Sequence, residues 1–126
     1  MTPAAPLAFC ALLGALAVFQ MLLILGLPLG RFAWGGQHAV LPARLRVGSA
    51  AAIVVYAVFA VVALDRGGLI PILPTPVIAV VAMWVIAAYL LFSLLPNLAS
   101  KSKPEKLVMV PLSLLLTALA VVIALS

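Results

Sequence analysis

Four long apolar stretches separated by short polar breaks decide what this 126-residue chain can fold into. We place them at about residues 6–27, 42–64, 76–96 and 103–125. Each has the ~20 residues that an α-helix needs to cross the hydrocarbon core of a bilayer. Because 68% of the residues are hydrophobic and 7% are charged, a soluble domain of this size would leave much apolar surface in water. The sequence therefore predicts an all-α fold: a four-helix transmembrane bundle that forms a single domain over residues 1–126.

Proline and small polar residues mark the expected helix ends. Pro28 follows the first apolar stretch and cannot comfortably continue a helix. Thr75 and Pro76 suit the N-cap and first turn of the third helix. The Ser-Lys-Pro-Glu run at 102–105 matches a capping box, in which Ser102 and Glu105 each accept a hydrogen bond from the other's backbone N–H.

The basic residues are divided unequally among the three loops. Loops one and three contain Arg31, Arg44, Arg46, Lys101, Lys103 and Lys106, whereas loop two contains Arg66. In an antiparallel up-down bundle, loops one and three share a side, and the positive-inside rule places them in the cytoplasm with the N and C termini outside. The net charge of +5 borders the spans, so we expect anionic lipid headgroups as partners, and no nucleic acid.

Ionisable groups are scarce where membrane carriers and enzymes need them. We expect none deep inside a span, which disfavours proton-coupled carriers and the small multidrug carriers with an embedded glutamate. His38 is the only histidine and Cys10 the only cysteine, so neither a nucleophilic triad nor a metal-ligand cluster is supported. Asp65 and Arg66 are expected to be solvated at the outer surface. The sequence therefore predicts no enzyme, no catalytic residues, no metal site and no cofactor.

Loop one combines flexible glycines, aromatic residues and charge-capable groups in the run Gly-Arg-Phe-Ala-Trp-Gly-Gly-Gln-His at 30–38. We expect it to lie along the membrane surface with Trp34 at headgroup depth. Its functional interpretation is a site for anionic lipid or a protein partner, and its simpler interpretation is a headgroup anchor. The residues of the hypothetical lipid- or partner-binding site are Arg31, Trp34, His38, Arg44, Arg46, Lys101 and Lys103.

Uncharged polar residues gather in the predicted cytoplasmic half of the spans, and they are Gln20, Tyr56, Tyr89, Ser93, Asn97 and Ser113. At 1.5 Å rise per residue, Gln20, Tyr89, Ser93 and Ser113 lie on the order of 5 to 12 Å inside the cytoplasmic boundary, with Tyr56 a little deeper. One hypothesis is a polar cavity open to the cytoplasm for a small neutral or anionic ligand. The alternative is a set of hydrogen bonds that fixes the register of the helices. Gln20 needs a partner in either case, because an amide exposed to lipid is costly.

The run at 30–38, with Leu41, Pro42, Leu45, Arg46 and Ser49 after it, resembles the first-loop signature of a family of small four-span bacterial integral membrane proteins with no established activity. A second signature of that family resembles Asn97, Ser100, Ser102, Glu105 and Lys106. The resemblance implies a multi-pass protein of the bacterial cytoplasmic (inner) membrane. It also implies that the two signatures lie close together on the cytoplasmic side.

Two functions of different classes follow from these observations. The first is a non-enzymatic accessory or scaffolding protein that binds anionic lipid or a larger membrane protein through its basic cytoplasmic face. The second is a small-molecule or ion transporter or channel built around the polar cavity, and we expect it to be a homo-oligomer because four short helices rarely enclose a pathway alone. A membrane enzyme would need catalytic groups from a partner chain.

Overall fold

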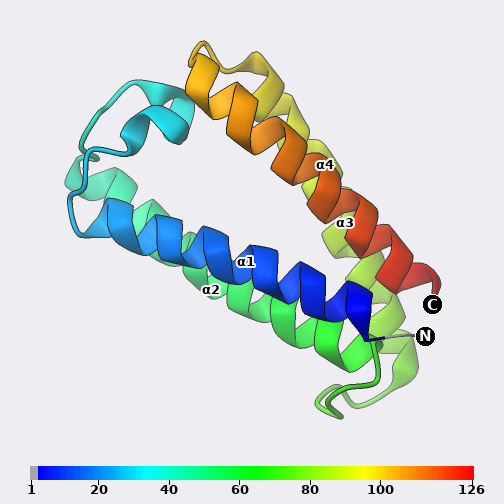
Figure 1. The fold of residues 1–126 in the computed structure, drawn as a ribbon. Helices are drawn as coiled ribbons and strands as arrows, with labels where there is room; N and C mark the ends of the chain where they lie inside the picture. Colours follow the sequence, from blue (N-terminus) through cyan, green and yellow to red (C-terminus); the bar gives the residue numbers. More distant parts are fainter. Residues whose placement is uncertain (1–2) are drawn as a thin grey trace.

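The computed structural model describes residues 3–126 and contains four α-helices joined by three loops (Figure 1). The helices are α1 (Ala4–Ile24), α2 (Ala43–Arg66), α3 (Pro76–Ala99) and α4 (Lys103–Leu125). Two short 3-10 turns, η1 (Gly30–Phe32) and η2 (Trp34–Gly36), lie in the first loop. All four α-helices are long and apolar enough to cross a membrane. The predicted all-α fold with four apolar helices is therefore confirmed.

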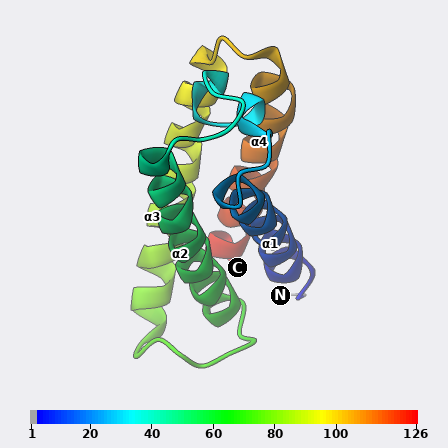
Figure 2. The ribbon, with the colours of Figure 1, turned by 90° about the vertical axis from the view of Figure 1, so that its left-hand side faces the viewer.

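The helices are arranged as two pairs. α1 packs along α2, and α3 packs along α4, with further contacts between α2 and α3 and between α1 and α4. The first loop and the α3–α4 connection lie at one end of the molecule, which we name the loop end (Figures 1 and 2). The start of α1, the end of α4 and the α2–α3 connection lie at the opposite, terminal end.

The helix ends follow local backbone chemistry. α1 ends at Ile24 because Gly26 adopts a left-handed φ of 92° and the N–H of Leu27 reaches the carbonyl of Leu22, which is a Schellman motif. The helix thus ends before Pro28, the residue expected to stop it. At the start of α3, the hydroxyl of Thr75 accepts a hydrogen bond from the N–H of Ile78 at 3.3 Å, as predicted.

The core of the protein is one apolar cluster that all four helices share. Phe9, Met83, Ala120 and Ile123 are completely buried in it. Large apolar side chains also cover the outside, and Val47, Phe92 and Leu107 are each about 70% or more exposed. A surface of this kind is stable in lipid, where apolar side chains need no shielding from water.

The terminal end is tied together by the two residues that were expected to be solvated. The carboxylate of Asp65 accepts hydrogen bonds from the backbone N–H groups of Ile72, at 2.7 Å, and Leu73, at 2.6 Å. The guanidinium of Arg66 donates to the carbonyl oxygen of Ala124 at 3.3 Å and to an oxygen of Ser126. Both side chains are half-buried, so they remain partly solvated and in addition pair with backbone groups of neighbouring segments.

The first loop packs against the helices of the bundle. Ala33 and Leu41 are buried against Leu23 of α1, and η1 contacts α4. The N–H of Gly30 donates to the carbonyl of Ala39 at 2.9 Å and closes the loop on itself. The loop therefore forms a wall at the loop end of the bundle.

Candidate functional site

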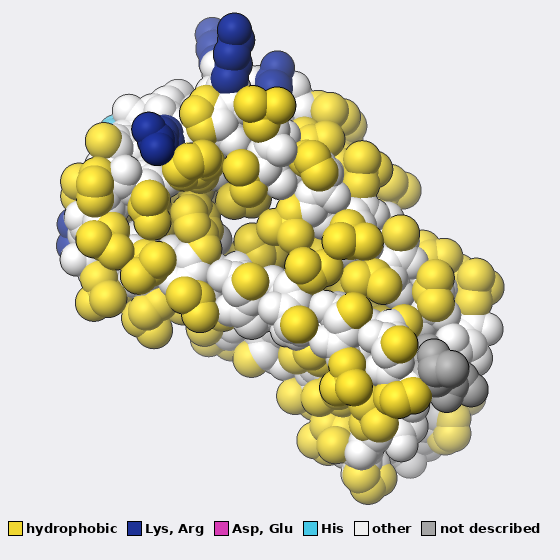
Figure 3. Space-filling view, in the orientation of Figure 1, with side chains coloured by type: hydrophobic (Ala, Val, Ile, Leu, Met, Phe, Trp, Pro, Cys, Tyr) yellow, Lys and Arg dark blue, Asp and Glu magenta, His cyan; other side chains and the backbone are white. Residues whose placement is uncertain are grey.

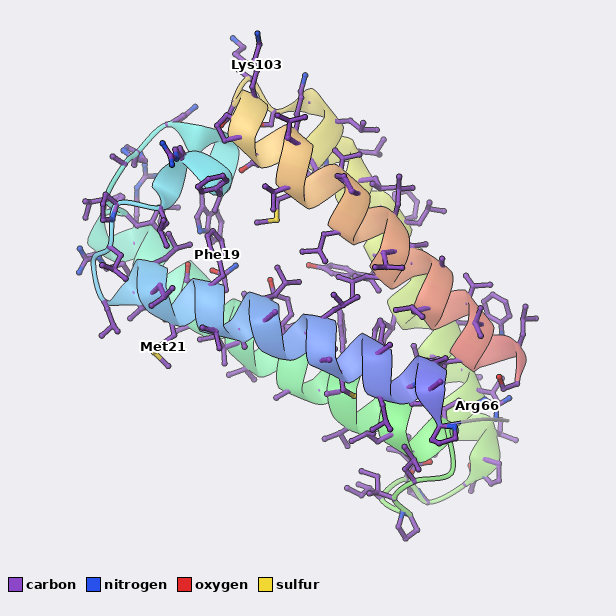
Figure 4. The ribbon with its side chains drawn as sticks, in the orientation of Figure 1. Phe19, Met21, Arg66 and Lys103 are labelled. Carbon is purple, nitrogen blue, oxygen red and sulfur yellow. The ribbon has the colours of Figure 1, made fainter. Side chains whose placement is uncertain are left out.

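A cavity of about 200 Å³ lies between the α1–α2 pair and the α3–α4 pair, with the first loop as part of its wall. Figure 4 shows side chains of α1 and α4 pointing into the space between these helices. Residues of all four helices line the cavity. They include every member of the predicted polar layer, Gln20, Tyr56, Tyr89, Ser93, Asn97 and Ser113. The topology therefore brings these six residues around one space.

Hydrogen bonds within the polar layer stay inside the helix pairs. Gln20 Nε2 donates to the hydroxyl of Tyr56 at 3.4 Å and links α1 to α2. Asn97 Nδ2 donates to Ser113 Oγ at 2.9 Å and links α3 to α4. Ser93 donates to the carbonyl of Leu90 within its own helix. The polar layer thus joins each pair internally and leaves the space between the pairs open.

Gln20 has an incomplete set of hydrogen bonds. Its side chain is 8% exposed, and Oε1 is buried without a partner. The hydroxyl of Tyr56 both donates and accepts, so either orientation of the amide leaves one of its terminal atoms unpaired. A buried polar atom without a partner costs about 1–3 kcal/mol. Among the described residues that line the cavity, Gln20 is the one with a buried polar atom that lacks a partner.

Trp34 is a wall of the cavity. Its indole N–H donates to the hydroxyl of Ser49 at 3.3 Å, and its ring lies against Gly48, where an added Cβ would come within 2.7 Å of the ring. The residue adopts a left-handed φ of 52°, which costs about 1–3 kcal/mol for a residue other than glycine. Trp34 is 43% exposed, so one part of its ring packs on the glycine of α2 and the rest stays at the surface, where the expected headgroup contact remains a prediction.

Glu105 is the cavity residue that the sequence analysis missed. It lies in the first turn of α4 and is 4% exposed. One carboxylate oxygen accepts a hydrogen bond from the N–H of Gly35 at 3.1 Å. The capping-box pattern accounts for Glu105 locally and hides its place in the cavity wall. The signal was present, since Asp65 and Glu105 are the only acidic residues in the chain.

The predicted capping box is therefore half correct. The hydroxyl of Ser102 accepts a hydrogen bond from the N–H of Glu105 at 3.5 Å, but the N–H of Ser102 donates to Ser100 Oγ at 3.1 Å and not to the glutamate. Ser102 Oγ also donates to the carbonyl of Arg31 at 2.5 Å. The two loop signatures are consequently in direct contact, through Ser102 with Arg31 and through Glu105 with Gly35.

The basic residues gather around the loop end, where they form most of the charged surface in Figure 3. Arg31, Arg44, Lys101 and Lys103 are exposed. Arg46 is half-buried and donates to the carbonyl of Leu41 at 2.8 Å, so it holds the first loop. His38 is half-buried in the same loop. Figure 4 shows Lys103 and Arg66 at opposite ends of the molecule.

The residues of the hypothetical lipid- or partner-binding site thus separate into two groups. Arg31, Arg44, Lys101 and Lys103 present charge to the surroundings. The guanidinium of Arg31 lies 4.9 Å from the centre of the Phe32 ring, a cation–π contact. Trp34 and Arg46 make internal contacts and position the loop.

Comparison of the chain with protein-family models, curated proteins and solved structures finds no match.

Proposed function

We propose that this chain is a multi-pass protein of the bacterial cytoplasmic membrane, with four antiparallel spans, the loop end in the cytoplasm and both termini outside. The four apolar helices support the membrane location. The six basic residues of loops one and three support the orientation. The likeness of both loop signatures to the four-span family supports the bacterial origin.

We propose further that the protein binds a small molecule in the cavity between the helix pairs and acts as a carrier or as part of a channel. The observation that carries this proposal is the 200 Å³ space lined by Gln20, a residue whose Oε1 is buried without a partner. The hydrogen bonds of Gln20 and Asn97 join neighbouring helices within each pair, which suits helix register, and they do not cross the space between the pairs, which leaves that space for a ligand. No catalytic step is part of this proposal.

The test is recovery of bound small molecules from protein extracted in native lipid discs. We expect a compound that is retained by the wild type and lost from Gln20→Leu. Thr117→Val is the matched control, because Thr117 bonds to the carbonyl of Ser113 within α4 and lies outside the cavity wall. Retention that does not differ between Gln20→Leu and the wild type would refute the proposal. Flux of the recovered compound in proteoliposomes then separates a carrier from a binding protein.

A second function, an accessory protein that binds anionic lipid or a larger membrane protein, is favoured by the exposed basic residues of the loop end. Each such residue contributes about 1 kcal/mol near an anionic surface. The test replaces Arg44, Lys101 and Lys103 together by glutamine, with and without Arg46→Gln, and quantifies co-purified lipid and protein. We expect the triple substitution to release anionic lipid, and unchanged retention would count against this function.

A further inference from the structure

We propose that the cavity binds the primary ammonium group of a single-chain amphiphilic amine, with Glu105 as the counter-ion and the alkyl chain in an apolar groove between α1 and α4. This inference rests on the proposed small-molecule function and names the chemical class of the ligand. It differs from the sequence-based hypothesis of a neutral or anionic ligand because the wall of the cavity contains a carboxylate.

The charge of Glu105 selects for a cation. The side chain is 4% exposed, and the N–H of Gly35 and the N-terminus of α4 provide partial positive charge beside it. Partial charges of backbone groups compensate a buried carboxylate less completely than a full positive charge does. An ammonium ion in the cavity would complete this compensation, whereas an anion would be repelled.

In the amide orientation of the structure, in which Nε2 donates to Tyr56, the unpaired atom of Gln20 is an acceptor and favours a ligand that donates hydrogen bonds. Gln20 lines the same cavity, and its Oε1 is buried without a partner. An ammonium group carries N–H donors and no acceptor, so it suits both Gln20 Oε1 and the carboxylate of Glu105. A quaternary ammonium would satisfy the charge and leave the amide oxygen unpaired. The acceptor set therefore favours a primary amine.

Aromatic residues also line the cavity that would hold the cation. Trp34, Tyr56 and Tyr89 line the cavity, and the Tyr89 ring packs edge to face on Phe59 with ring centres 5.6 Å apart. Aromatic faces attract cations, and tryptophan does so most strongly. A carboxylate together with aromatic rings is a combination that recognises organic ammonium ions.

The volumes point to an amphiphile. The cavity of about 200 Å³ is smaller than the ~300–1,000 Å³ of sites for drug-sized ligands, so it holds a head group. A groove of about 360 Å³ adjoins it and shares Leu16, Phe32, Met109 and Leu112 with the cavity wall. Scaled from the ~150 Å³ that holds benzene, this groove has room for about a dozen carbon atoms, one alkyl chain and not two.

The groove also has a route into lipid. Its side chains come from α1, the first loop and α4, and they include Phe19, which Figure 4 labels on α1. Ala15 and Val108 on its rim are exposed. A chain with its head at Glu105 would therefore pass between α1 and α4 and reach the acyl region of the bilayer.

The experiment measures binding of dodecylammonium to the full chain in discs of phosphatidylcholine and phosphatidylglycerol, which contain no amino lipid. Native mass spectrometry counts bound probe, and empty discs give the background partition. We expect one saturable site per chain, and about tenfold to a hundredfold weaker binding to Glu105→Gln, the range produced by loss of a charge-assisted hydrogen bond. Glutamine keeps an oxygen that accepts from Gly35, so the loop contact is preserved.

Asp65→Asn is the matched control, because it neutralises the only other acidic residue, lies at the terminal end and keeps an acceptor for the second loop. Dodecanol tests whether binding needs the positive charge, and butylammonium tests whether binding needs the long alkyl chain. Both probes are expected to bind more weakly than dodecylammonium. Gln20→Leu is expected to weaken dodecylammonium binding independently of Glu105→Gln, so a folding defect in one variant does not decide the result.

Equal binding of dodecanol and dodecylammonium, or equal binding by Glu105→Gln and the wild type, would overturn the inference. Competition by phosphatidylethanolamine at the same site would overturn the single-chain assignment and identify a phospholipid as the source of the ammonium group. Failure of dodecylammonium to bind, alongside Gln20-dependent retention of another compound from native membranes, would refute the ligand class and leave the proposed function standing.

Discussion

Replacing Gln20 by leucine separates the two interpretations of the polar layer by the sign of its effect on stability. If Gln20 serves to fix helix register, its loss destabilises the protein. In the structure its hydrogen bond to Tyr56 is long, at 3.4 Å, and Oε1 is unpaired. We therefore expect that Gln20→Leu leaves the free energy of unfolding unchanged or raises it.

The magnitude follows from two opposing contributions. Hydrogen bonds between membrane helices average about 0.6 kcal/mol, and a 3.4 Å bond is at the weak end of the range. Removing a buried acceptor without a partner regains about 1–3 kcal/mol, less where cavity water already bonds to it. The balance is a gain on the order of 0–2 kcal/mol for Gln20→Leu.

The assay is reversible unfolding in lipid bicelles, followed by circular dichroism or by steric trapping, for Gln20→Leu, Tyr56→Phe and the double variant. We expect a coupling energy between the two sites of no more than about 0.6 kcal/mol. Ser113→Ala is the contrasting variant: it breaks the 2.9 Å bond from Asn97 and should cost about 1 kcal/mol or more. A loss above about 1 kcal/mol for Gln20→Leu would refute the reasoning and favour the register interpretation.

Two further predictions concern the first loop and the orientation. Gly35 and Gly36 have φ values of 77° and 72°, so alanine at either should lower the free energy of unfolding by about 1 kcal/mol or more. Gly36→Ala should cost more, because its Cβ would lie 2.4 Å from Cβ of Ser102, whereas Gly35 has open space; equal losses would contradict this packing. In a cysteine-free chain, Lys101→Cys should react with an impermeant maleimide only from the cytoplasm and Ser126→Cys only from outside. The reverse pattern would invert the proposed orientation.

The sequence was sufficient where structure depends on neighbours along the chain. The length and hydropathy of four stretches predict four helices, and Thr75 with Pro76 predicts the start of α3 through a hydrogen bond three residues away. The four-residue spacing of Tyr89, Ser93 and Asn97 places them in one cavity wall for the same reason.

The sequence alone does not predict the contacts of a residue that can bond either to a local partner or to a partner far away in the chain. Glu105 has a local option in the capping box but bonds to Gly35, seventy residues away. Trp34 packs part of its ring on Gly48, which leaves space for it, and this contact is a property of packing between segments. Arg66 reaches the last turn of α4 for a similar reason. Such choices depend on the assembled bundle and have no signature in spacing alone.

The two ends of the bundle are fastened very differently. At the terminal end, the apolar core and the hydrogen bonds from Arg66 to the end of α4 hold both helix pairs together. At the loop end, the first loop is latched to α4 by the hydrogen bonds of Ser102 with Arg31 and of Glu105 with Gly35. Breaking these two hydrogen bonds would remove two contacts between the first loop and α4 and would leave the contacts of the terminal end intact. Because Gly35 bonds to one oxygen of the Glu105 carboxylate, a cation bound in the cavity would share that carboxylate with the first loop, and ligand binding would be coupled to the contact between the loop and α4.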